Sequence, residues 1–304
     1  MKVLLTGATG FLGSHILRSL IEHNIEIIIL KRSFSNDDKI AKFNTQYRAY
    51  DIDKISLYEV FEKEFNINAV IHCATNYGRK KGKVSEIFQS NVYFPLQLLE
   101  TATFFNTATF INTDSSLNKT ELVKGYMQNY ILTKKQFLEW GRLFAETKKI
   151  SFINMKLEHI YGAGDDDSKF TSFIVHSCIN NLDKIDLTDG EQLRDFIYID
   201  DVISAYLTIL INEQTQKGYC EYEVGSGMAI KIRDFVTTVK QIAKSTTKLY
   251  FGAISYRENE ILYSQANISK LKKLGWSPKY DIKKGIETYI DNLTKTRPDG
   301  EENH

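Results

Sequence analysis

The chain has 304 residues, and its 39 basic and 38 acidic side chains leave a formal net charge of +1. This balance excludes the strong basic bias of a nucleic-acid or membrane-surface binder. Its apolar runs are only strand-sized and it starts directly on an apolar strand, so neither a transmembrane segment nor a signal peptide is expected. The three cysteines are far apart, which predicts reduced thiols in a cytoplasmic protein rather than a metal site.

Strand-like apolar runs alternate with amphipathic helical runs through the first half of the chain. This alternation is typical of an α/β fold, a Rossmann-type doubly wound parallel sheet with helices on both faces. The expected strands cover residues 3–5, 25–30, 68–72, 109–112 and 151–157, and the expected helices cover 13–23, 85–104 and 125–147.

After residue 157 the alternation gives way to loops, which predicts a smaller mixed α/β region in the C-terminal part. We expect a dinucleotide-binding domain at 1–157, with returning segments near 190–212. A substrate domain is expected at 158–295, followed by a polar, flexible tail at 296–304.

A glycine-rich turn joins the first strand to the first helix, with the sequence Thr6-Gly7-Ala8-Thr9-Gly10-Phe11-Leu12-Gly13. Glycines permit a tight turn and a close approach of the backbone, and the helix N-terminus offers free amides to a pyrophosphate. Placed between a strand and a helix, this spacing predicts a dinucleotide site at Gly7, Gly10, Phe11, Leu12 and Gly13.

The end of the second strand bears on the choice between NAD and NADP, because an acid there binds ribose hydroxyls and a cation binds a 2′-phosphate. The strand ends in Leu30-Lys31-Arg32-Ser33, with no acid before Asp37. Two cations, one of them a planar guanidinium, suit a phosphate. We therefore expect NADP(H), with Lys31 and Arg32 among its ligands.

Tyr130 and Lys134 stand four residues apart within the expected helix 125–147, so they share one helix face. A nearby ammonium favours phenolate and lowers the pKa of the phenol from its usual value of about 10. A phenol tuned in this way can exchange a proton with a carbonyl or alcohol oxygen. Alone the pair could be a surface coincidence, and it gains weight from the dinucleotide turn in the same chain.

The turn, Tyr130 and Lys134 together resemble the extended short-chain dehydrogenase/reductase superfamily, in its nucleotide-sugar branch. Further stretches match in order: Ala69-Val70-Ile71-His72-Cys73-Ala74-Thr75, Asn91, Tyr161-Gly162-Ala163-Gly164, Arg194-Asp195-Phe196-Ile197-Tyr198-Ile199-Asp200-Asp201 and Gly275-Trp276-Ser277-Pro278. The resemblance implies a helix-paired homodimer. It also implies cofactor contacts at Asp51, Ile52, Cys73, Ala74, Thr75, Asn91, Tyr130, Lys134, Leu157 and His159, besides those already named.

Roles at the site follow from the same resemblance. Tyr130 is expected to donate a proton to the substrate oxygen, while Lys134 lowers the pKa of that phenol and binds the nicotinamide ribose. Thr113 matches the Ser/Thr whose hydroxyl orients the carbonyl, with Ser115 as the alternative if the strand register is shifted by two. Asn91 matches the active-site asparagine of the family.

A closer resemblance is to the CDP-abequose and CDP-paratose synthases, which are 4-reductases of CDP-4-keto-3,6-dideoxyhexoses. It rests on Asn112-Thr113-Asp114-Ser115, Lys156-Leu157-Glu158-His159-Ile160-Tyr161-Gly162, Gly190-Glu191-Gln192 and Phe251-Gly252-Ala253-Ile254. It implies NADPH-dependent reduction of the C4 ketone of a CDP-linked 4-keto-6-deoxy or 3,6-dideoxy sugar, in surface polysaccharide synthesis. Reductases of GDP-linked 6-deoxy-heptoses remain an alternative.

Position 115 separates the reaction types of this superfamily. The 4,6-dehydratases carry Thr-Asp-Glu where this chain has Thr113-Asp114-Ser115, and their glutamate removes a proton that a serine cannot. GDP-fucose synthase carries a cysteine there and a downstream histidine, where this chain has Ser115 and Lys169. Simple keto reduction remains. A nucleotide-sugar 4-epimerase with retained NAD and a non-catalytic NADPH-binding protein are the competing interpretations.

The substrate positions that the resemblance implies are Thr113, Ser115, Tyr130, His159, Lys169, Arg194, Arg257 and Glu260. Arg194 and Arg257 match pyrophosphate ligands, since a diphosphate favours guanidinium groups. Glu260 matches an acid that meets the nucleotide ribose, and His159 replaces an asparagine near the nicotinamide and sugar. The run Asp165-Asp166-Asp167 fits a solvated loop better than a metal site.

Overall fold

The computed structural model describes residues 1–78, 83–119, 127–147, 150–212 and 218–295. The chain forms two compact units. The first unit comprises Met1–Leu157, Ile203–Val224 and Ser269–Trp276, and the second comprises Glu158–Val202, Gly225–Ile268 and the described residues from Ser277 onward.

The boundary between these units falls after Leu157, where the sequence pattern changes. The segment expected to return to the first domain, 190–212, divides between the two units, because residues up to Val202 belong to the second. A second returning segment, Ser269–Trp276, has no counterpart among the expectations. The expected tail at 296–304 lies outside the described residues.

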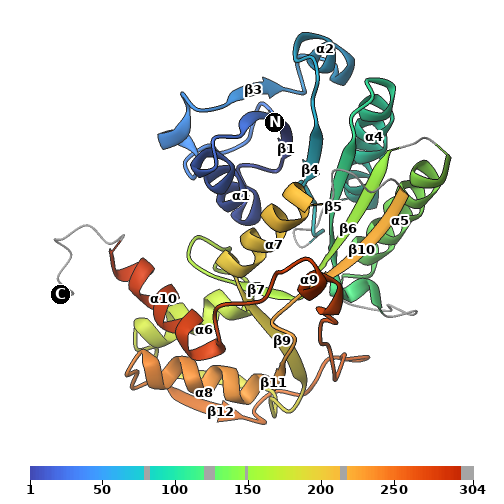
Figure 1. Ribbon diagram of the computed structural model, residues 1–304. Coiled ribbons are helices and arrows are strands. Elements are labelled where there is room, and N and C mark those ends of the chain that lie inside the picture. The colour runs from blue at the N-terminus through green and yellow to red at the C-terminus, as the bar shows by residue number, and fades with distance from the viewer. Residues whose placement is uncertain (79–82, 120–126, 148–149, 213–217, 296–304) are drawn as a thin grey trace. The chain divides into compact units, whose positions relative to one another are not determined.

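The first unit contains a parallel sheet of seven strands in the order β10-β6-β5-β4-β1-β2-β3 (Figure 1). The strands are β1 Lys2–Thr6, β2 Glu26–Lys31, β3 Arg48–Asp51, β4 Ala69–His72, β5 Thr109–Ser115, β6 Ser151–Leu157 and β10 Gly218–Val224. The strand order runs outward from β1 in both directions, and ligands of doubly wound sheets bind at the carboxyl ends of the strands at such a reversal, here β1 and β4. The predicted doubly wound Rossmann-type sheet is confirmed.

Helices cover both faces of this sheet. They are α1 Phe11–Glu22, α2 Leu57–Lys63, α3 Val84–Phe88, α4 Phe94–Phe104, α5 Gln128–Thr147, α7 Ile199–Asn212 and α9 Ser269–Lys273. On β4, Val70 joins the buried cluster that contains Leu98 of α4 and Phe137 of α5. Its neighbour Ile71 points to the other face, toward α1 and α7. The alternation of side chains along a buried strand therefore produces three layers.

One expected helix is interrupted. The segment expected as a helix at 85–104 consists of α3, a π-helix at Gln89–Tyr93, and α4. The helix expected at 125–147 begins at Gln128 in the described residues, and 125–126 lie outside them. Strands β3 and β10 were not expected from the sequence.

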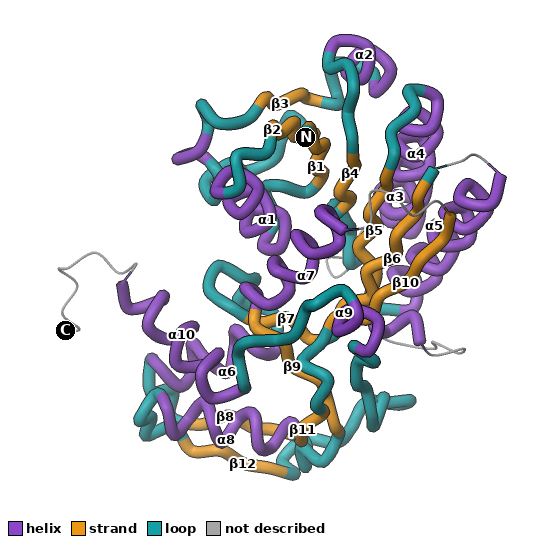
Figure 2. The backbone as a smooth tube through the Cα atoms, viewed as in Figure 1, coloured by secondary structure: helices purple, strands orange, loops and turns teal. Residues whose placement is uncertain are grey.

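The second unit is a smaller mixed α/β assembly, as predicted (Figure 2). Its strands are β7 His159–Tyr161, β8 Lys184–Leu187, β9 Leu193–Tyr198, β11 Ala229–Lys231 and β12 Lys248–Phe251, and its helices are α6 Phe170–Ile179, α8 Ile232–Ile242 and α10 Ile282–Lys295. β9 pairs in parallel with β7 and antiparallel with β11, and β8 pairs with β12. Phe196 of β9 stacks on Phe235 of α8 with ring centroids 4.2 Å apart.

Asp195 anchors a loop to β9 within this unit. Its buried carboxylate accepts hydrogen bonds from the amides of Ser226, Gly227 and Ala266. These bonds satisfy the buried carboxylate. No helix in the described parts of either unit combines the length and the apolar composition needed to cross a membrane.

Candidate active site

The glycine turn after β1 tolerates no side chain at two positions. Gly7 has φ of +72°, and a Cβ atom on it would lie 2.6 Å from the amide nitrogen of Ala74. A Cβ atom on Gly13 would lie 2.0 Å from the carbonyl oxygen of Gly7. Gly10, the N-cap of α1, closes the turn by donating its amide to Gly7 O at 3.0 Å.

The N-terminus of α1 suits an anionic ligand. Gly10 offers no capping side chain, and the first turn of the helix, which starts with Phe11 and Leu12, carries no acid. A helix N-terminus without a capping side chain or an acid suits a negative charge, which the helix dipole also favours. The turn and the helix together fit the pyrophosphate of a dinucleotide.

The two cations at the end of β2 have different surroundings. Lys31 forms an ion pair with Asp37, which offsets its charge. Arg32 lies over the ring of Phe34, 5.7 Å from the ring centroid, and forms no ion pair within the described ranges. Arg32 is therefore the better placed of the two to meet a phosphate.

Asp51 and Ile52 lie beside this strand end. The Asp51 carboxylate accepts a hydrogen bond from the Ser33 hydroxyl at 2.6 Å, which lowers the pKa of Asp51. The amide of Ile52 donates to the carbonyl of Lys31 at 2.9 Å. This hydrogen bond fixes the start of the loop after β3 against the end of β2, beside the residues expected to bind the 2′-phosphate.

The residues after β4 pack tightly against β1. The amide of Cys73 donates to Thr6 O at 3.2 Å, and that of Ala74 donates to the Thr6 hydroxyl at 3.3 Å. Burial raises the pKa of Cys73 to about 12, so its sulfur stays a thiol. Cys73 is therefore a neutral thiol beside β1 and not a nucleophile.

Tyr130 and Lys134 are both buried on α5, with 5% and 4% of their surfaces exposed. The Lys134 ammonium donates to the carbonyl of Thr113 at 2.6 Å, which ties α5 to the end of β5. Burial lowers the pKa of Lys134, and the charge of Asp114 acts in the opposite direction. A buried phenol and a buried amine one helical turn apart suit proton transfer rather than a surface pair.

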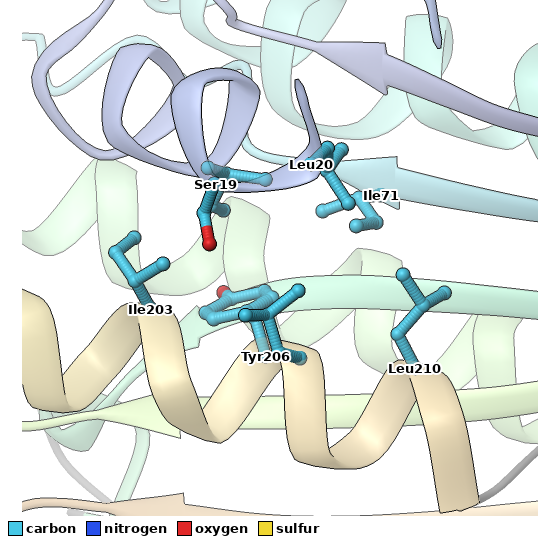
Figure 3. A pocket seen from close by; sticks show the side chains of 8 residues that line it. Ser19, Leu20, Ile71, Ile203, Tyr206 and Leu210 are labelled. Atoms are coloured by element: carbon cyan, nitrogen blue, oxygen red, sulfur yellow. The ribbon is translucent and has the colours of Figure 1, made fainter. Parts of the chain in front are cut away.

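The Thr113 hydroxyl contacts two buried groups. It lies 2.7 Å from the hydroxyl of Tyr206 on α7 and 3.2 Å from the sulfur of Cys73. Tyr206 points into the interior from α7, and its ring lies near Ser19 of α1 and Ile71 of β4 (Figure 3). Tyr206 was not among the predicted site residues, because a tyrosine on the buried face of an amphipathic helix cannot be distinguished in the sequence from an ordinary core residue.

Ser115 and Asp114 have contrasting environments. Ser115 is half-buried, and its hydroxyl oxygen accepts a hydrogen bond from the amide of Leu117 at 3.2 Å. Both oxygens of buried Asp114 are engaged, one by Asn118 and the amide of Ser115, the other by Asn154. Asp114 is therefore a structural carboxylate that supports the loop after β5.

Asn91 lies in the π-helix and is buried. Its amide oxygen accepts from the Asn76 amide at 2.7 Å and from the Thr75 hydroxyl at 3.2 Å. Its amide nitrogen donates to Asn76 O at 2.9 Å and to the Thr133 hydroxyl at 3.1 Å. Asn91 thus fastens the loop after β4 to α5, one residue before Lys134.

In the second unit, the buried guanidinium of Arg194 forms an ion pair with the half-buried carboxylate of Glu260. The guanidinium donates to the Glu260 carboxylate at 2.7 Å, and 7% of the Arg194 side chain is exposed. Burial lowers the pKa of Arg194, opposed by Glu260 and Glu158, and a guanidinium still remains charged. Arg257 is exposed in the same loop as Glu260, and its carbonyl accepts the Glu260 amide at 3.2 Å.

His159 starts β7, two residues after Leu157 ends β6. The Nδ1 atom of His159 is buried, lies 3.9 Å from the Glu158 carboxylate, and has no hydrogen-bond partner among the described residues. Glu158 also accepts a hydrogen bond from Ser264 at 2.7 Å. A buried carboxylate thus stands directly behind the imidazole.

Lys169 and Asp165 form an ion pair of 2.7 Å between a half-buried amine and a buried carboxylate. Asp165 therefore has a defined structural partner, whereas the adjacent Asp166 and Asp167 are exposed. No group of three His, Cys, Asp or Glu side chains suitable for a metal ion occurs in the described ranges. The pairing also limits the freedom of Lys169 to act as an acid or a base.

The predicted residues thus gather in two places. The first unit brings together the glycine turn, Cys73, Thr113, Tyr130 and Lys134 at the carboxyl ends of β1, β4 and β5. The second unit holds Arg194, Glu260, Arg257, His159 and Lys169.

Sequence relatives bear on the identity of this arrangement. The chain is 38% identical over 294 residues to CDP-abequose synthase of Salmonella typhimurium, covering 96% of this chain and 98% of the relative. It is 40% identical over 290 residues to CDP-abequose synthase of Salmonella muenchen, covering 95% and 97%. A putative UDP-glucose 4-epimerase of Methanocaldococcus jannaschii is more distant, at 26% identity over 311 residues.

Solved structures share the fold. UDP-glucose 4-epimerase from Thermotoga maritima with UDP-glucose matches with a TM-score of 0.85 at 20% identity, covering 97% of this chain and 99% of the other. UDP-glucuronic acid 4-epimerase from Bacillus cereus, in complex with UDP-glucuronic acid and NAD, matches with 0.84 at 21% identity, covering 98% and 100%. The sequence profile described as the NAD dependent epimerase/dehydratase family matches residues 3–225. The predicted membership of the extended short-chain dehydrogenase/reductases is confirmed: the chain belongs to the NAD dependent epimerase/dehydratase family.

Proposed function

We propose that the protein is an NADPH-dependent reductase of the C4 ketone of a CDP-linked 4-keto-6-deoxy or 3,6-dideoxy sugar, in the synthesis of a surface polysaccharide sugar. The prediction of a nucleotide-sugar oxidoreductase is confirmed by relatives of 38% and 40% identity, both CDP-abequose synthases, that align over nearly the whole chain. The observation that carries the reaction type is the buried pair of Tyr130 and Lys134 without a second acid–base residue at position 115.

Tyr130 supplies the proton in this proposal. NADPH, when bound, supplies the hydride that reduces the C4 carbonyl. Tyr130 then protonates the alkoxide oxygen, the Thr113 hydroxyl orients that oxygen, and the Lys134 cation stabilises the phenolate that remains. Asn91 bonds the amide and the carbonyl of Asn76 and so holds the loop after β4, which lies beside the phenol of Tyr130.

Dehydration and epimerisation at C3 or C5 both need a base that removes a proton from carbon. Among the described residues, Ser115 has no neighbour that accepts its hydroxyl proton; its partner, the amide of Leu117, is a donor. Asp114 is held by three donors, and Lys169 is paired with Asp165. These contacts support reduction as the sole chemistry of the site.

The proposed preference for NADPH depends on Arg32. Its guanidinium has no ion pair within the described ranges, whereas Lys31 is neutralised by Asp37. Arg32 would bind the 2′-phosphate, and the glycine turn with the N-terminus of α1 would bind the pyrophosphate. Tyr130 and Lys134 would meet the nicotinamide end.

The second unit is proposed to bind the nucleotide. Arg194 and Arg257 would meet the diphosphate, Glu260 the ribose, and His159 the sugar. The ion pair of Arg194 with Glu260 supports this assignment, because it holds the guanidinium in one orientation before the substrate arrives.

We also propose a homodimer formed through α5. Leu132, Trp140 and Leu143 are 55%, 42% and 46% exposed, although each is large and apolar. Their spacing places them along one stripe of the helix, opposite Tyr130 and Lys134. A second copy of this helix would cover the stripe. The proposed compartment is the cytoplasm, which suits three free cysteines.

The test is oxidation of NADPH by the purified chain with 4-keto-6-deoxy and 4-keto-3,6-dideoxy sugars carried on CDP, GDP, UDP and dTDP. NMR of the product at C4 then identifies the new hydroxyl. We expect turnover on the CDP sugars. Stoichiometric bound NAD with interconversion of C4 epimers would establish the epimerase instead. Binding of NADPH with no turnover on any sugar would establish a non-catalytic binder.

A further inference from the structure

The interior where α5 packs against β5, β6 and β10 holds two amines and two carboxylates, Lys134, Lys156, Asp114 and Glu221. Lys134 and Asp114 are 4% and 2% exposed, and Lys156 is also buried. Lys156 forms an ion pair of 2.8 Å with the half-buried Glu221, so these two charges offset each other. The amine of Lys134 and the carboxylate of Asp114 are the two charges that remain.

Asp114 at the end of β5 has the hydrogen bonds of an anion. One oxygen accepts from the Ser115 amide and from the Asn118 side chain, both at 2.8 Å, and the other accepts from Asn154 at 2.9 Å. All three partners are donors, which is the pattern of an ionised carboxylate, because such a group can only accept. All three are also neutral, so these bonds hold the carboxylate in place without offsetting its charge.

The ammonium of Lys134 has the complementary surroundings. Its hydrogen bond goes to the neutral carbonyl of Thr113, the residue next to Asp114, at 2.6 Å. Within the described ranges Lys134 forms no ion pair, although a buried cation is costly without an anion nearby. Burial lowers the pKa of Lys134, and the charge of Asp114 opposes this effect.

The other titratable groups that face these two charges are neutral. Burial and the charge of Lys134 hold the pKa of His72 on β4 well below its ordinary value. Burial raises the pKa of Cys73 to about 12 and that of Tyr206 on α7 well above its ordinary value. In the described part of the chain, Asp114 is therefore the negative charge that acts on Lys134 at neutral pH.

We propose that Asp114 is the counter-charge of Lys134 and keeps this buried amine protonated, so that the cation is present when Tyr130 gives up its proton. Without a nearby anion a buried amine loses its proton more readily, and a neutral amine cannot stabilise a phenolate. Asp114 is thus a positioning residue that acts through Lys134. The inference depends on the proposed reductase function, because the cation serves the phenolate that remains after reduction.

A double-mutant cycle, measured by urea unfolding at pH 7, tests the pairing and needs neither cofactor nor substrate. Asp114→Asn removes the charge at nearly constant shape. We expect it to lower the urea midpoint of the parent protein, and to lower that of Lys134→Met by at most about half as much, because no buried cation is left there to be offset. Equal losses in the two backgrounds would overturn the inference.

Asn154→Ala is the matched control for this cycle, because it removes one donor to Asp114 but leaves the charge. It should lower the midpoints of the parent protein and of Lys134→Met equally. If Asp114→Asn fails to fold alone, the double variant with Lys134→Met should fold. A double variant that is also unfolded would overturn the inference.

The dependence of kcat on pH, measured with NADPH and a CDP-4-keto sugar, tests the consequence for turnover. We expect the alkaline limb to move about one pH unit lower in Asp114→Asn, since Lys134 then loses its proton more readily. Asn154→Ala should keep the limb of the parent protein. A limb that stays in place in Asp114→Asn, or that moves equally in Asn154→Ala, would overturn the inference. A parent protein without turnover on any sugar would instead refute the proposed function, and the unfolding cycle would still decide whether Asp114 and Lys134 are paired.

Discussion

The Thr113 hydroxyl lies 2.7 Å from the hydroxyl of Tyr206, a fully buried side chain of α7 that comes 93 residues later in the chain. A hydroxyl has one proton to donate and two lone pairs that accept. If Tyr206 donates to Thr113, the Thr113 proton is free for a substrate oxygen. Thr113 then acts as a polarised donor, since hydrogen bonds in a chain strengthen one another.

Replacing Tyr206 by phenylalanine removes this support and leaves the ring in place. We expect kcat to fall about tenfold at nearly constant KM, together with a loss of about 1 kcal/mol in the free energy of unfolding. Steady-state kinetics and urea unfolding measure the two effects. A variant with the stability loss but full kcat would show that Tyr206 is only a packing residue.

A pair of substitutions separates the two candidate hydroxyls on β5. Thr113→Val keeps the shape and loses the donor, so we expect kcat to drop about 100-fold, as when one oxyanion donor is removed. Ser115→Ala should change kcat only about threefold or less, because the carbonyl is assigned to Thr113 and the Ser115 hydroxyl supports the loop after β5 by accepting from the amide of Leu117. The reverse order of effects would assign the carbonyl to Ser115.

Tyr130→Phe tests the proton donor directly. The phenyl ring preserves the stack with Tyr77 and removes the only proton that the ring can give. We expect kcat to fall by about 10²- to 10⁴-fold, while the dissociation constant for NADPH, measured by fluorescence titration, stays within about twofold. Near-normal turnover would refute the assigned mechanism.

Lys134→Met should inactivate the protein and stabilise it near neutral pH. Burial holds the folded-state pKa of Lys134 below its unfolded value, so the buried cation costs stability at every pH below the folded pKa. That cost disappears as the pH rises from the folded pKa to the unfolded one. Urea midpoints at pH 7 and pH 10 should therefore show a gain that shrinks at the higher pH.

Lys63→Met, an exposed position on α2, is the control for this experiment and should show no such trend. A destabilised Lys134→Met at pH 7 would mean that the hydrogen bond to Thr113 O outweighs the cost of burying the charge.

Arg32→Ala tests the cofactor preference. If Arg32 binds the 2′-phosphate, the dissociation constant for NADPH should rise about 10- to 100-fold, whereas that for NADH should barely change. Lys31→Ala should have a smaller effect on NADPH, because Asp37 already neutralises that amine. Equal affinities for NADPH and NADH in the parent protein would contradict the role of both cations.

The sequence predicted the sheet because buried parallel strands and the glycine turn leave strong local signals, such as the run Val3-Leu4-Leu5. It did not predict β10, since Gly218–Val224 becomes the sheet edge only by pairing with β6, more than sixty residues away. Strand β3 was not predicted for a similar reason: its four residues form a strand only by pairing with β2 at the other edge of the sheet.

The same distinction between local and long-range contacts applies to the site residues. Tyr130 and Lys134 are four residues apart, so their proximity is a property of one helix. The contact between Thr113 and Tyr206 joins two distant segments, and no local pattern encodes it. The hydrogen bond between Asn91 and Asn76, fifteen residues apart, likewise leaves no local pattern in the sequence.

The π-helix at Gln89–Tyr93 makes the length of this segment as important as its composition. A π turn holds one residue more than an α turn, so deleting a single residue would restore a regular helix. Everything before the deletion would then rotate by about 100° relative to α4. Asn91 would lose its hydrogen bonds to the backbone of Asn76. The segment should therefore tolerate many substitutions but no single-residue insertion or deletion.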